Sequence, residues 1–390
     1  MSTIVIAMLP ELGHINPTLK LASSLRLRGH QVCYLIGPDY EAYMRAQGFK
    51  SISLGEQFTR ARHKSSSQLD VIEYLQEARM QGWALNEYYT GVVQVFRQEI
   101  AALISKFRPN LFLLDPYVPD IALIARELGQ PFVFLCPTLI NPLTGTPLLT
   151  SQPDLGQVPE LILCAGEFDF PQSRQTGKKA RYYLGSSVDL QRKEDDPFDW
   201  QKLDPTKRLL HCSLGSQPQN LIGAKRFFQI LIDVVSDLDD CQLIVVTGAH
   251  FANDFPSVPQ NVIVAPRVPQ LRIIKRADVL ITHGGLSTIK EAILLGTPMI
   301  VFPSITDQHA NAARVAYHHL GVTGDMATVT PEQVRTLLER VMQPHFRERV
   351  LAFQKTLQTI DAAETDVRIV EALLASLAKK GHAMHSTARY

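Results

Sequence analysis

Short apolar runs alternate with helical patterns along the chain, and this alternation constrains the fold more than any other feature. In the first half it predicts strands at 4–9, 32–36, 111–114 and 132–135, and helices at 17–28, 68–105 and 120–128. Strands that alternate with helices form parallel sheets whose two faces are covered by helices. The first half is therefore predicted to be a doubly wound α/β domain.

A polar stretch with two prolines, residues 189–207, separates this pattern from a second one. We expect a linker there, preceded by long loops in the Pro-, Thr- and Gly-rich residues 137–175. Beyond the linker, strands are predicted at 209–213, 242–247, 262–265, 279–282 and 299–302, and helices near 222–236 and 288–295. Because 390 residues exceed one ordinary domain, the chain is predicted to form two domains, 1–195 and 205–375, with a cleft between them.

The composition is that of a soluble globular protein, with 45% hydrophobic and 20% charged residues. Its 39 basic and 38 acidic residues give a net charge of +1, so no overall field attracts nucleic acid. The five cysteines are scattered and form no CxxC motif, which predicts reduced thiols in a cytoplasmic protein. No run is predicted to span a membrane, and the opening segment lacks the features of a signal peptide. A peripheral membrane contact stays open.

His14 is the first candidate for chemistry. Asn16 and Pro17 predict the N-cap and the first residue of a helix, so His14 is expected just before a helix N-terminus. That position is the ligand-binding edge of an open α/β sheet, and the helix end should keep the imidazole neutral. Asp115, which ends the strand at 111–114, could orient such a base. The alternative for both is a structural role in a turn, and Asp120 is expected to cap the next helix.

The stretch 282–292, THGGLSTIKEA, predicts a strand, a glycine turn and a helix start. Gly284 and Gly285 allow a ligand to approach the backbone, and the helix N-terminus favours an anion. The stretch is neither a P-loop nor a GxGxxG fingerprint, and it suits a diphosphate. As alternatives, Thr288 and Glu291 could form only a capping box, and Asp307 only an N-cap. The DxD-like residues 237–239 fall between a helix and a strand, so no metal is predicted.

Five segments together resemble the family 1 nucleotide-sugar glycosyltransferases, which include plant secondary-product, macrolide and carotenoid glycosyltransferases. These segments are GHINP at 13–17, LLDPYVPDIALIARELGQP at 113–131, SLGS at 213–216, RVPQL at 267–271, and THGGLSTIKEAILLGTPMIVFPSITDQHANAARV at 282–315. The resemblance runs from about residue 3 to residue 340. It implies the GT-B fold, in which two Rossmann-like domains face across a cleft. The N-terminal domain would bind the acceptor and the C-terminal domain the donor, with a last helix at 346–377 crossing back.

The resemblance also implies roles for individual residues. His14 matches the base and Asp115 its acidic partner. The donor residues would be Gly215 and Ser216 at the diphosphate, His283, Gly285, Ser287 and Thr288 in the phosphate-binding turn, Glu291 at the ribose, Asp307 and Gln308 at the sugar, and Val268 and Gln270 in the segment that reads the base. Arg267 replaces the usual tryptophan that stacks on uracil. An arginine can also stack on a base, so the choice between UDP and dTDP stays open.

The implied function is an inverting, metal-independent transfer of a hexose from a UDP- or dTDP-sugar to a hydroxyl group of a hydrophobic small molecule, without a cofactor. Two alternatives are a GT-B relative such as a nucleotide-sugar epimerase, and a non-catalytic protein that binds nucleotide sugars or lipophiles. Residues 56–100 and 137–175 are expected to shape the acceptor pocket. Trp83, Tyr88 and Phe96 are its candidate residues, although their helical spacing also fits a place in the core.

Overall fold

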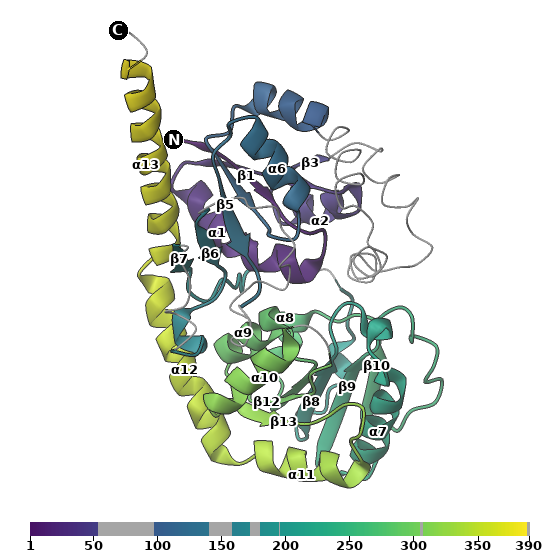
Figure 1. Ribbon diagram of the computed structural model, residues 1–390. Helices are drawn as coiled ribbons and strands as arrows, with labels where there is room; N and C mark the ends of the chain where they lie inside the picture. The colour runs from purple at the N-terminus through teal and green to yellow at the C-terminus, as the bar shows by residue number, and fades with distance from the viewer. Residues whose placement is uncertain (54–96, 140–157, 172–179, 195, 305–306, 388–390) are drawn as a thin grey trace, which may run out of the picture.

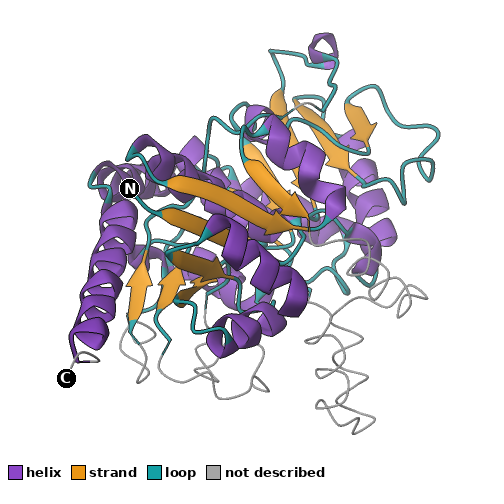
Figure 2. Cartoon of the chain, turned by 90° about the horizontal axis from the view of Figure 1, so that it is seen from above, coloured by secondary structure: helices purple, strands orange, loops and turns teal. Residues whose placement is uncertain are grey.

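The computed structural model describes residues 1–53, 97–139, 158–171, 180–194, 196–304 and 307–387. Two separate parallel sheets organise these residues, as Figure 1 shows, and Figure 2 shows helices on both sides of the strands. This arrangement confirms the predicted α/β class with two doubly wound units. The sheets occupy residues 3–183 and 208–323, and the exact domain boundaries stay a prediction.

The N-terminal sheet has the order β3-β2-β1-β4-β5-β6-β7. Its strands are β1 (Thr3–Ala7), β2 (Gln31–Ile36), β3 (Lys50–Ser53), β4 (Leu111–Leu114), β5 (Phe132–Cys136), β6 (Glu160–Ile162) and β7 (Arg181–Tyr183). Helices α1 (Leu12–Leu27), α2 (Glu41–Ala46) and α6 (Pro119–Glu127) belong to this unit. The prediction of loops throughout 137–175 was wrong at β6, because a three-residue strand is too short to show an apolar period.

The C-terminal sheet has the order β10-β9-β8-β11-β12-β13. Its strands are β8 (Arg208–Ser213), β9 (Cys241–Val246), β10 (Val262–Ala265), β11 (Val279–Thr282), β12 (Met299–Val301) and β13 (Gly321–Thr323). The helices are α7 (Ala224–Ser236), α8 (Gln270–Ile274), α9 (Leu286–Leu295), α10 (Gln308–Tyr317) and α11 (Pro331–Val341). In this sheet β8 lies between β9 and β11, so the loops after β8 and β11 emerge side by side.

Two helix starts differ from the prediction. Helix α1 begins at Leu12, with Glu11 in extended conformation at its N-cap, so Pro17 lies inside the helix. The predicted start at Asn16 and Pro17 was therefore wrong, and His14 is in the first turn of the helix. Asp120 is not the cap of α6, because Pro119 starts that helix one residue earlier and Val118 is the N-cap.

Two helices, rather than the one expected at 346–377, lead back to the N-terminal unit. They are α12 (Pro344–Ala362) and α13 (Thr365–Thr387), and Glu364 between them has a left-handed φ of 48°. Figure 1 shows α13 running along the N-terminal unit beside α1. Val367 and Val370 join the apolar cluster under α1. Nε2 of His30, in the N-terminal unit, lies 3.5 Å from Oε1 of Glu371 in α13.

The two units also share a buried interface. One apolar cluster contains residues of both units, including Phe168 from the first and Ile289 from the second. Arg314 on α10 donates to Asp169 of the N-terminal unit from Nε at 2.9 Å and from a terminal nitrogen at 2.8 Å, and both side chains are fully buried. Lys290 on α9 donates to the carbonyl of Leu163, and burial lowers its pKa to about 8. None of the helices described is both long enough and apolar enough to cross a membrane.

Candidate active site

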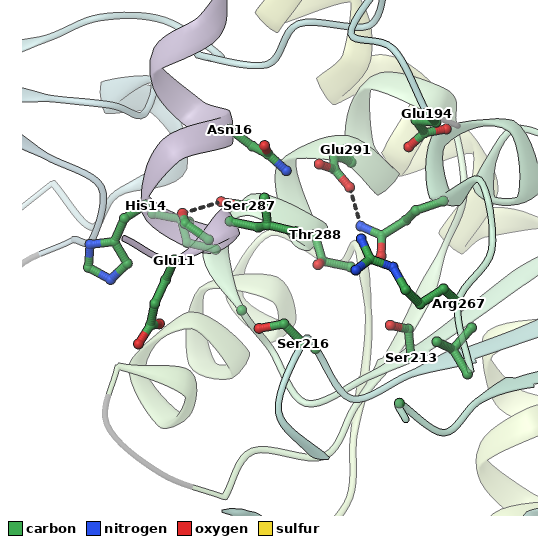
Figure 3. A pocket seen from close by; sticks show the side chains of 18 of the residues that line it. Glu11, His14, Asn16, Glu194, Ser213, Ser216, Arg267, Ser287, Thr288 and Glu291 are labelled. Carbon is green, nitrogen blue, oxygen red and sulfur yellow. Dashed lines mark hydrogen bonds between the residues drawn. The ribbon is translucent and has the colours of Figure 1, made fainter. Parts of the chain in front are cut away.

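A cleft of about 630 Å³ lies between the two units and gathers the predicted donor residues. It is lined by His14 and by the twelve residues Gly215, Ser216, Arg267, Val268, Gln270, His283, Gly285, Ser287, Thr288, Glu291, Asp307 and Gln308. In Figure 3, His14 lies at one end and Arg267 at the other, with Ser287 and Thr288 between them. The cleft is therefore long enough to separate a reacting group from a group bound near Arg267. Trp83, Tyr88 and Phe96 lie outside the described residues.

Asp115 and His14 meet because β1 and β4 are parallel neighbours. Ala7 and Leu114 are register partners at the ends of these strands, so the loops that follow lie side by side. The Asp115 N–H donates to the Ala7 carbonyl at 2.8 Å, which holds Asp115 beside the turn before α1. Its Oδ2 atom lies 2.6 Å from Nδ1 of His14, and its carboxylate also accepts the N–H groups of Leu9 and Tyr117. Asp115 is thus fully buried and satisfied, while 15% of the His14 side chain remains exposed to the cleft.

The pKa of His14 is raised, whereas a helix end alone was predicted to favour the neutral ring. Burial lowers the pKa of His14, but the carboxylates of Asp115, Glu11 and Asp307 outweigh that effect and raise the pKa above its ordinary value. A hydrogen bond from Nδ1 to a carboxylate leaves Nε2 as the nitrogen that can exchange a proton with a ligand. The site therefore holds a histidine of increased basicity in a fixed orientation.

Pro17 explains a contact between the two turns that flank the cleft. Proline has no N–H, so the carbonyl of Gly13, four residues earlier in α1, receives no helical hydrogen bond from it. The hydroxyl of Ser287 donates to that carbonyl at 3.1 Å, as a dashed line in Figure 3 marks. Ser287 is in the first turn of α9, so this bond holds the His14 turn against the glycine turn of the other unit.

The glycine turn after β11 packs closely against β12 and the start of α10. Gly284 has a φ of 95°, and a Cβ there would come within 2.8 Å of Val301. Helix α9 begins at Leu286, and its N-cap, Gly285, makes no side-chain capping bond. The first N–H groups of a ten-residue helix thus face the cleft without a side-chain cap, which suits an anion. The alternative prediction that Thr288 and Glu291 form a capping box was wrong. Both residues lie inside α9, whose N-cap is Gly285.

The ring of His283 lies between Gly285 of this turn and Gly215 of the loop after β8. A Cβ added to Gly215 would lie 2.8 Å from its ring, and one added to Gly285 would lie 3.0 Å away. Burial lowers the pKa of His283 to about 4, so the ring is neutral. A neutral imidazole can donate one hydrogen bond to an anion in the cleft without adding a charge.

Glu291 projects from α9 toward the start of α8. Its Oε2 atom accepts a hydrogen bond of 2.5 Å from Nε2 of Gln270, and its Oε1 atom accepts one from Arg192. Arg192 belongs to the linker and had no predicted role, because a charged linker is ordinarily a solvated segment. Glu194 and Asp196 of the linker also line the cleft and were missed for the same reason.

Three further predicted donor residues also line the cleft. They are Arg267, Asp307 and Gln308. Arg267 is 65% exposed and its Nε lies 3.0 Å from Oδ1 of Asp196. Asp307 is at the N-cap position of α10, but its side chain makes no capping bond to the helix backbone and instead accepts from Asn311 at 2.9 Å. Gln308 accepts the N–H of Ser304 at 3.0 Å.

Comparison with known proteins identifies relatives of the whole chain. Residues 229–367 match the family described as Erythromycin biosynthesis protein CIII-like, C-terminal domain. NDP-glycosyltransferase YjiC of Bacillus licheniformis is 24% identical over 95% of this chain and 98% of its own length. Demethyllactenocin mycarosyltransferase of Streptomyces fradiae is also 24% identical, over 88% of this chain and 80% of its own.

Solved structures share the arrangement of both units. The glycosyltransferase of kitacinnamycin superposes with a TM-score of 0.73 at 24% identity, over 95% of this chain and 98% of its own. Glycosyltransferase VinC, solved with dTDP, superposes with a TM-score of 0.69 at 18% identity, over 97% of this chain and all of its own. These structures show that the fold is GT-B. By the family match at residues 229–367 and by these full-length relatives, the chain is similar to nucleotide-sugar glycosyltransferases that act in natural-product biosynthesis.

Proposed function

We propose that the chain is an inverting glycosyltransferase that moves a hexose from a nucleotide-diphosphate sugar to a hydroxyl group, with His14 as the base. The observation that carries this proposal is the 2.6 Å contact between Nδ1 of His14 and the buried carboxylate of Asp115. That contact leaves Nε2 for the acceptor hydroxyl and stabilises the imidazolium that forms when the proton is taken up. A protein that only binds nucleotide sugars has no need of this pair.

In the proposed reaction, Nε2 of His14 removes the hydroxyl proton while the acceptor oxygen attacks the anomeric carbon. The bond from that carbon to the phosphate oxygen breaks, and the nucleotide diphosphate leaves from the opposite face of the sugar. Its growing charge meets the uncapped N-terminus of α9 and the hydroxyls of Ser287 and Thr288. Donors held in place in this way each contribute about 3–4 kcal/mol to a transition state. We propose that they serve instead of a metal ion, and that the reaction needs no cofactor.

The contact between Ser287 and Gly13 supports the assignment of the base to one unit and of the diphosphate site to the other. It joins the turn that would bind the diphosphate to the turn that carries His14, at a hydroxyl-to-carbonyl distance of 3.1 Å. The base and the leaving group are therefore held on two touching segments, one from each unit. Positioning of two reacting groups in this way accounts for a large part of catalytic acceleration in general.

We further propose that the acceptor is a hydroxylated hydrophobic small molecule of the natural-product type. The relatives support this class, since they include a demethyllactenocin mycarosyltransferase and an oleandomycin glycosyltransferase. We expect the reaction to take place in the cytoplasm, in line with five free, buried cysteines. A test is incubation with UDP-glucose or dTDP-glucose and a panel of such acceptors, followed by mass spectrometry. A glycoside product supports transfer, an epimerised or free sugar supports the epimerase alternative, and no product with bound nucleotide supports a binding protein.

The pH dependence of the reaction follows from the pKa of His14. Only the neutral ring can accept a proton, so kcat/KM should fall as the pH drops through the raised pKa of His14. In Asp115→Asn the ring loses its carboxylate while its burial remains, so this acid limb should move to lower pH. The plateau rate should also fall, because the ring tautomer is no longer fixed. A pH profile of kcat/KM for both proteins measures this, and an unchanged acid limb in the variant would contradict the pairing.

A further inference from the structure

Four linker residues, Arg192, Lys193, Glu194 and Asp196, connect the donor side of the cleft to the N-terminal unit, and we call them the linker strap. The side chains of Arg192, Glu194 and Asp196 each contact the C-terminal unit. The backbone of Lys193 points the other way: its N–H donates to Gln47 at 2.9 Å and its carbonyl accepts from Gln47 at 3.0 Å. The strap is thus held from both units beside the cleft, in an alternation typical of extended chain.

The strap contacts Glu291 directly, and it also contacts α8, the helix that carries Gln270, the second hydrogen-bond partner of Glu291. One terminal nitrogen of Arg192 donates to Oε1 of Glu291, and the other donates to Glu194 at 3.2 Å. Glu194 in turn accepts the N–H of Leu271, at 2.9 and 3.0 Å to its two oxygens, at the start of α8. That helix begins with Gln270, which donates to Oε2 of Glu291. Both oxygens of Glu291 are therefore fixed by the strap, one directly and one through α8.

Because Glu291 is buried, its carboxylate needs the charge and the hydrogen bonds that Arg192 and Gln270 supply. The Arg192 side chain is 6% exposed and that of Glu291 is 3% exposed. A carboxylate so far from water is unfavourable unless a cation and hydrogen bonds compensate it. Arg192 supplies that charge, and among the described residues it is the cation that contacts Glu291 directly. Without it, Glu291 would lose both its counter-charge and one of its two fixed contacts.

These contacts leave part of the Glu291 carboxylate able to accept hydrogen bonds from a ligand. An ionised carboxylate offers about four acceptor positions, two on each oxygen. Arg192 uses one on Oε1 and Gln270 uses one on Oε2, which leaves one free position on each oxygen. Two hydroxyl groups on neighbouring carbons, such as the 2′ and 3′ hydroxyls of ribose, match this pair of positions. A 2′-deoxyribose would leave one of them without a donor in a buried site.

We propose that Arg192 is a positioning residue that fixes Glu291 for a vicinal diol, so that the donor site favours ribonucleoside over 2′-deoxyribonucleoside diphosphates. This inference rests on the proposed nucleotide-sugar function of the cleft. It assigns the choice between UDP and dTDP donors to the linker strap and Glu291 rather than to Arg267 alone.

Binding of UDP and of 2′-deoxy-UDP, measured by calorimetry, tests the proposal because the two ligands differ by one hydroxyl. The wild-type protein should bind UDP at least about tenfold more tightly, since an unpaired buried acceptor carries a cost of this order. Arg192→Met should weaken UDP binding about ten- to a hundredfold and reduce the ratio between the two ligands to about one. Arg192→Lys, which keeps the charge, should retain part of the ratio. Arg181→Met is the matched control, because it breaks the buried pair with Glu160 outside the cleft and should leave the ratio unchanged.

A double variant keeps the test informative if Arg192→Met folds poorly. Arg192→Met with Glu291→Gln removes the uncompensated charge, and it should bind UDP no more weakly than Glu291→Gln alone, because both changes act on one contact. If Arg192→Met lowers UDP affinity equally in both backgrounds, Arg192 acts independently of Glu291 and the proposal is wrong. Equal binding of UDP and 2′-deoxy-UDP by the wild type would also overturn it, while glycosyl transfer itself could stand. Failure to bind either ligand would overturn the proposed function as well.

Discussion

His14→Ala should reduce the rate of glycosyl transfer by about 10²–10⁴-fold, the contribution expected of a positioned general base. The variant removes the ring whose Nδ1 lies 2.6 Å from Asp115, and with it the histidine–carboxylate pair of the cleft. UDP affinity should change little, because the glycine turn and α9 belong to the other unit. Steady-state kinetics with a nucleotide sugar, together with calorimetric binding of UDP, measure both effects.

His30→Ala is the matched control for this variant. His30 is in the same unit, beside Glu371 of α13 and outside the cleft, so its loss should leave the rate of transfer near that of the wild type. A His14→Ala protein that turns over at the wild-type rate would exclude His14 as the base. A variant that loses UDP binding together with transfer would indicate that the substitution has disturbed the whole cleft.

Arg314→Met should lower the free energy of unfolding by about 3–5 kcal/mol, the typical cost of removing one partner of a buried ion pair. Arg314 contributes two nitrogen contacts to Asp169, at 2.9 and 2.8 Å, across the interface between the two units. Without it, the buried carboxylate of Asp169 loses both arginine contacts, while the hydroxyl of Tyr183 still donates to it at 2.7 Å. Thermal or urea unfolding followed by circular dichroism measures the loss.

Two further variants show whether the loss of stability in Arg314→Met comes from the buried charge of Asp169 or from the loss of an arginine as such. Arg28→Met breaks the exposed pair with Glu364 and should cost only about 0–1 kcal/mol. Adding Asp169→Asn to Arg314→Met should recover part of the stability, because the remaining side chain carries no buried charge. If Arg314→Met proved no less stable than Arg28→Met, the buried pair would not be what joins the units.

Much of the fold could be predicted from the sequence because many of the strands are continuous apolar runs. The predicted strands at 111–114, 262–265 and 279–282 coincide with β4, β10 and β11. The short strands β6, β7 and β13 have three residues each and carry no period, so tertiary pairing alone defines them. Strand order is likewise absent from local sequence, and it is the neighbouring position of β1 and β4 that brings Asp115 to His14.

The errors in the candidate site have a common physical cause, which is contact between distant segments. Asn16 and Pro17 have the composition of a helix start, but the hydroxyl of Ser287 compensates for the missing N–H of Pro17 inside α1. The prediction of a neutral His14 considered the helix end and omitted the three carboxylates that raise the pKa. Arg192 is part of the predicted polar linker, and local sequence does not show that the two units bury it together.

The anomeric configuration of the product shows whether the sugar is transferred in a single displacement with His14 as the base. The wild-type protein would be incubated with UDP-α-D-glucose and an acceptor that gives a glycoside, and the product examined by proton NMR. A base on one face of the sugar and a diphosphate leaving from the other require inversion, so we expect a β-glucoside with its large coupling between H1 and H2. An α-glucoside would show that the configuration is retained, and it would contradict the role of His14 as the base of a single displacement.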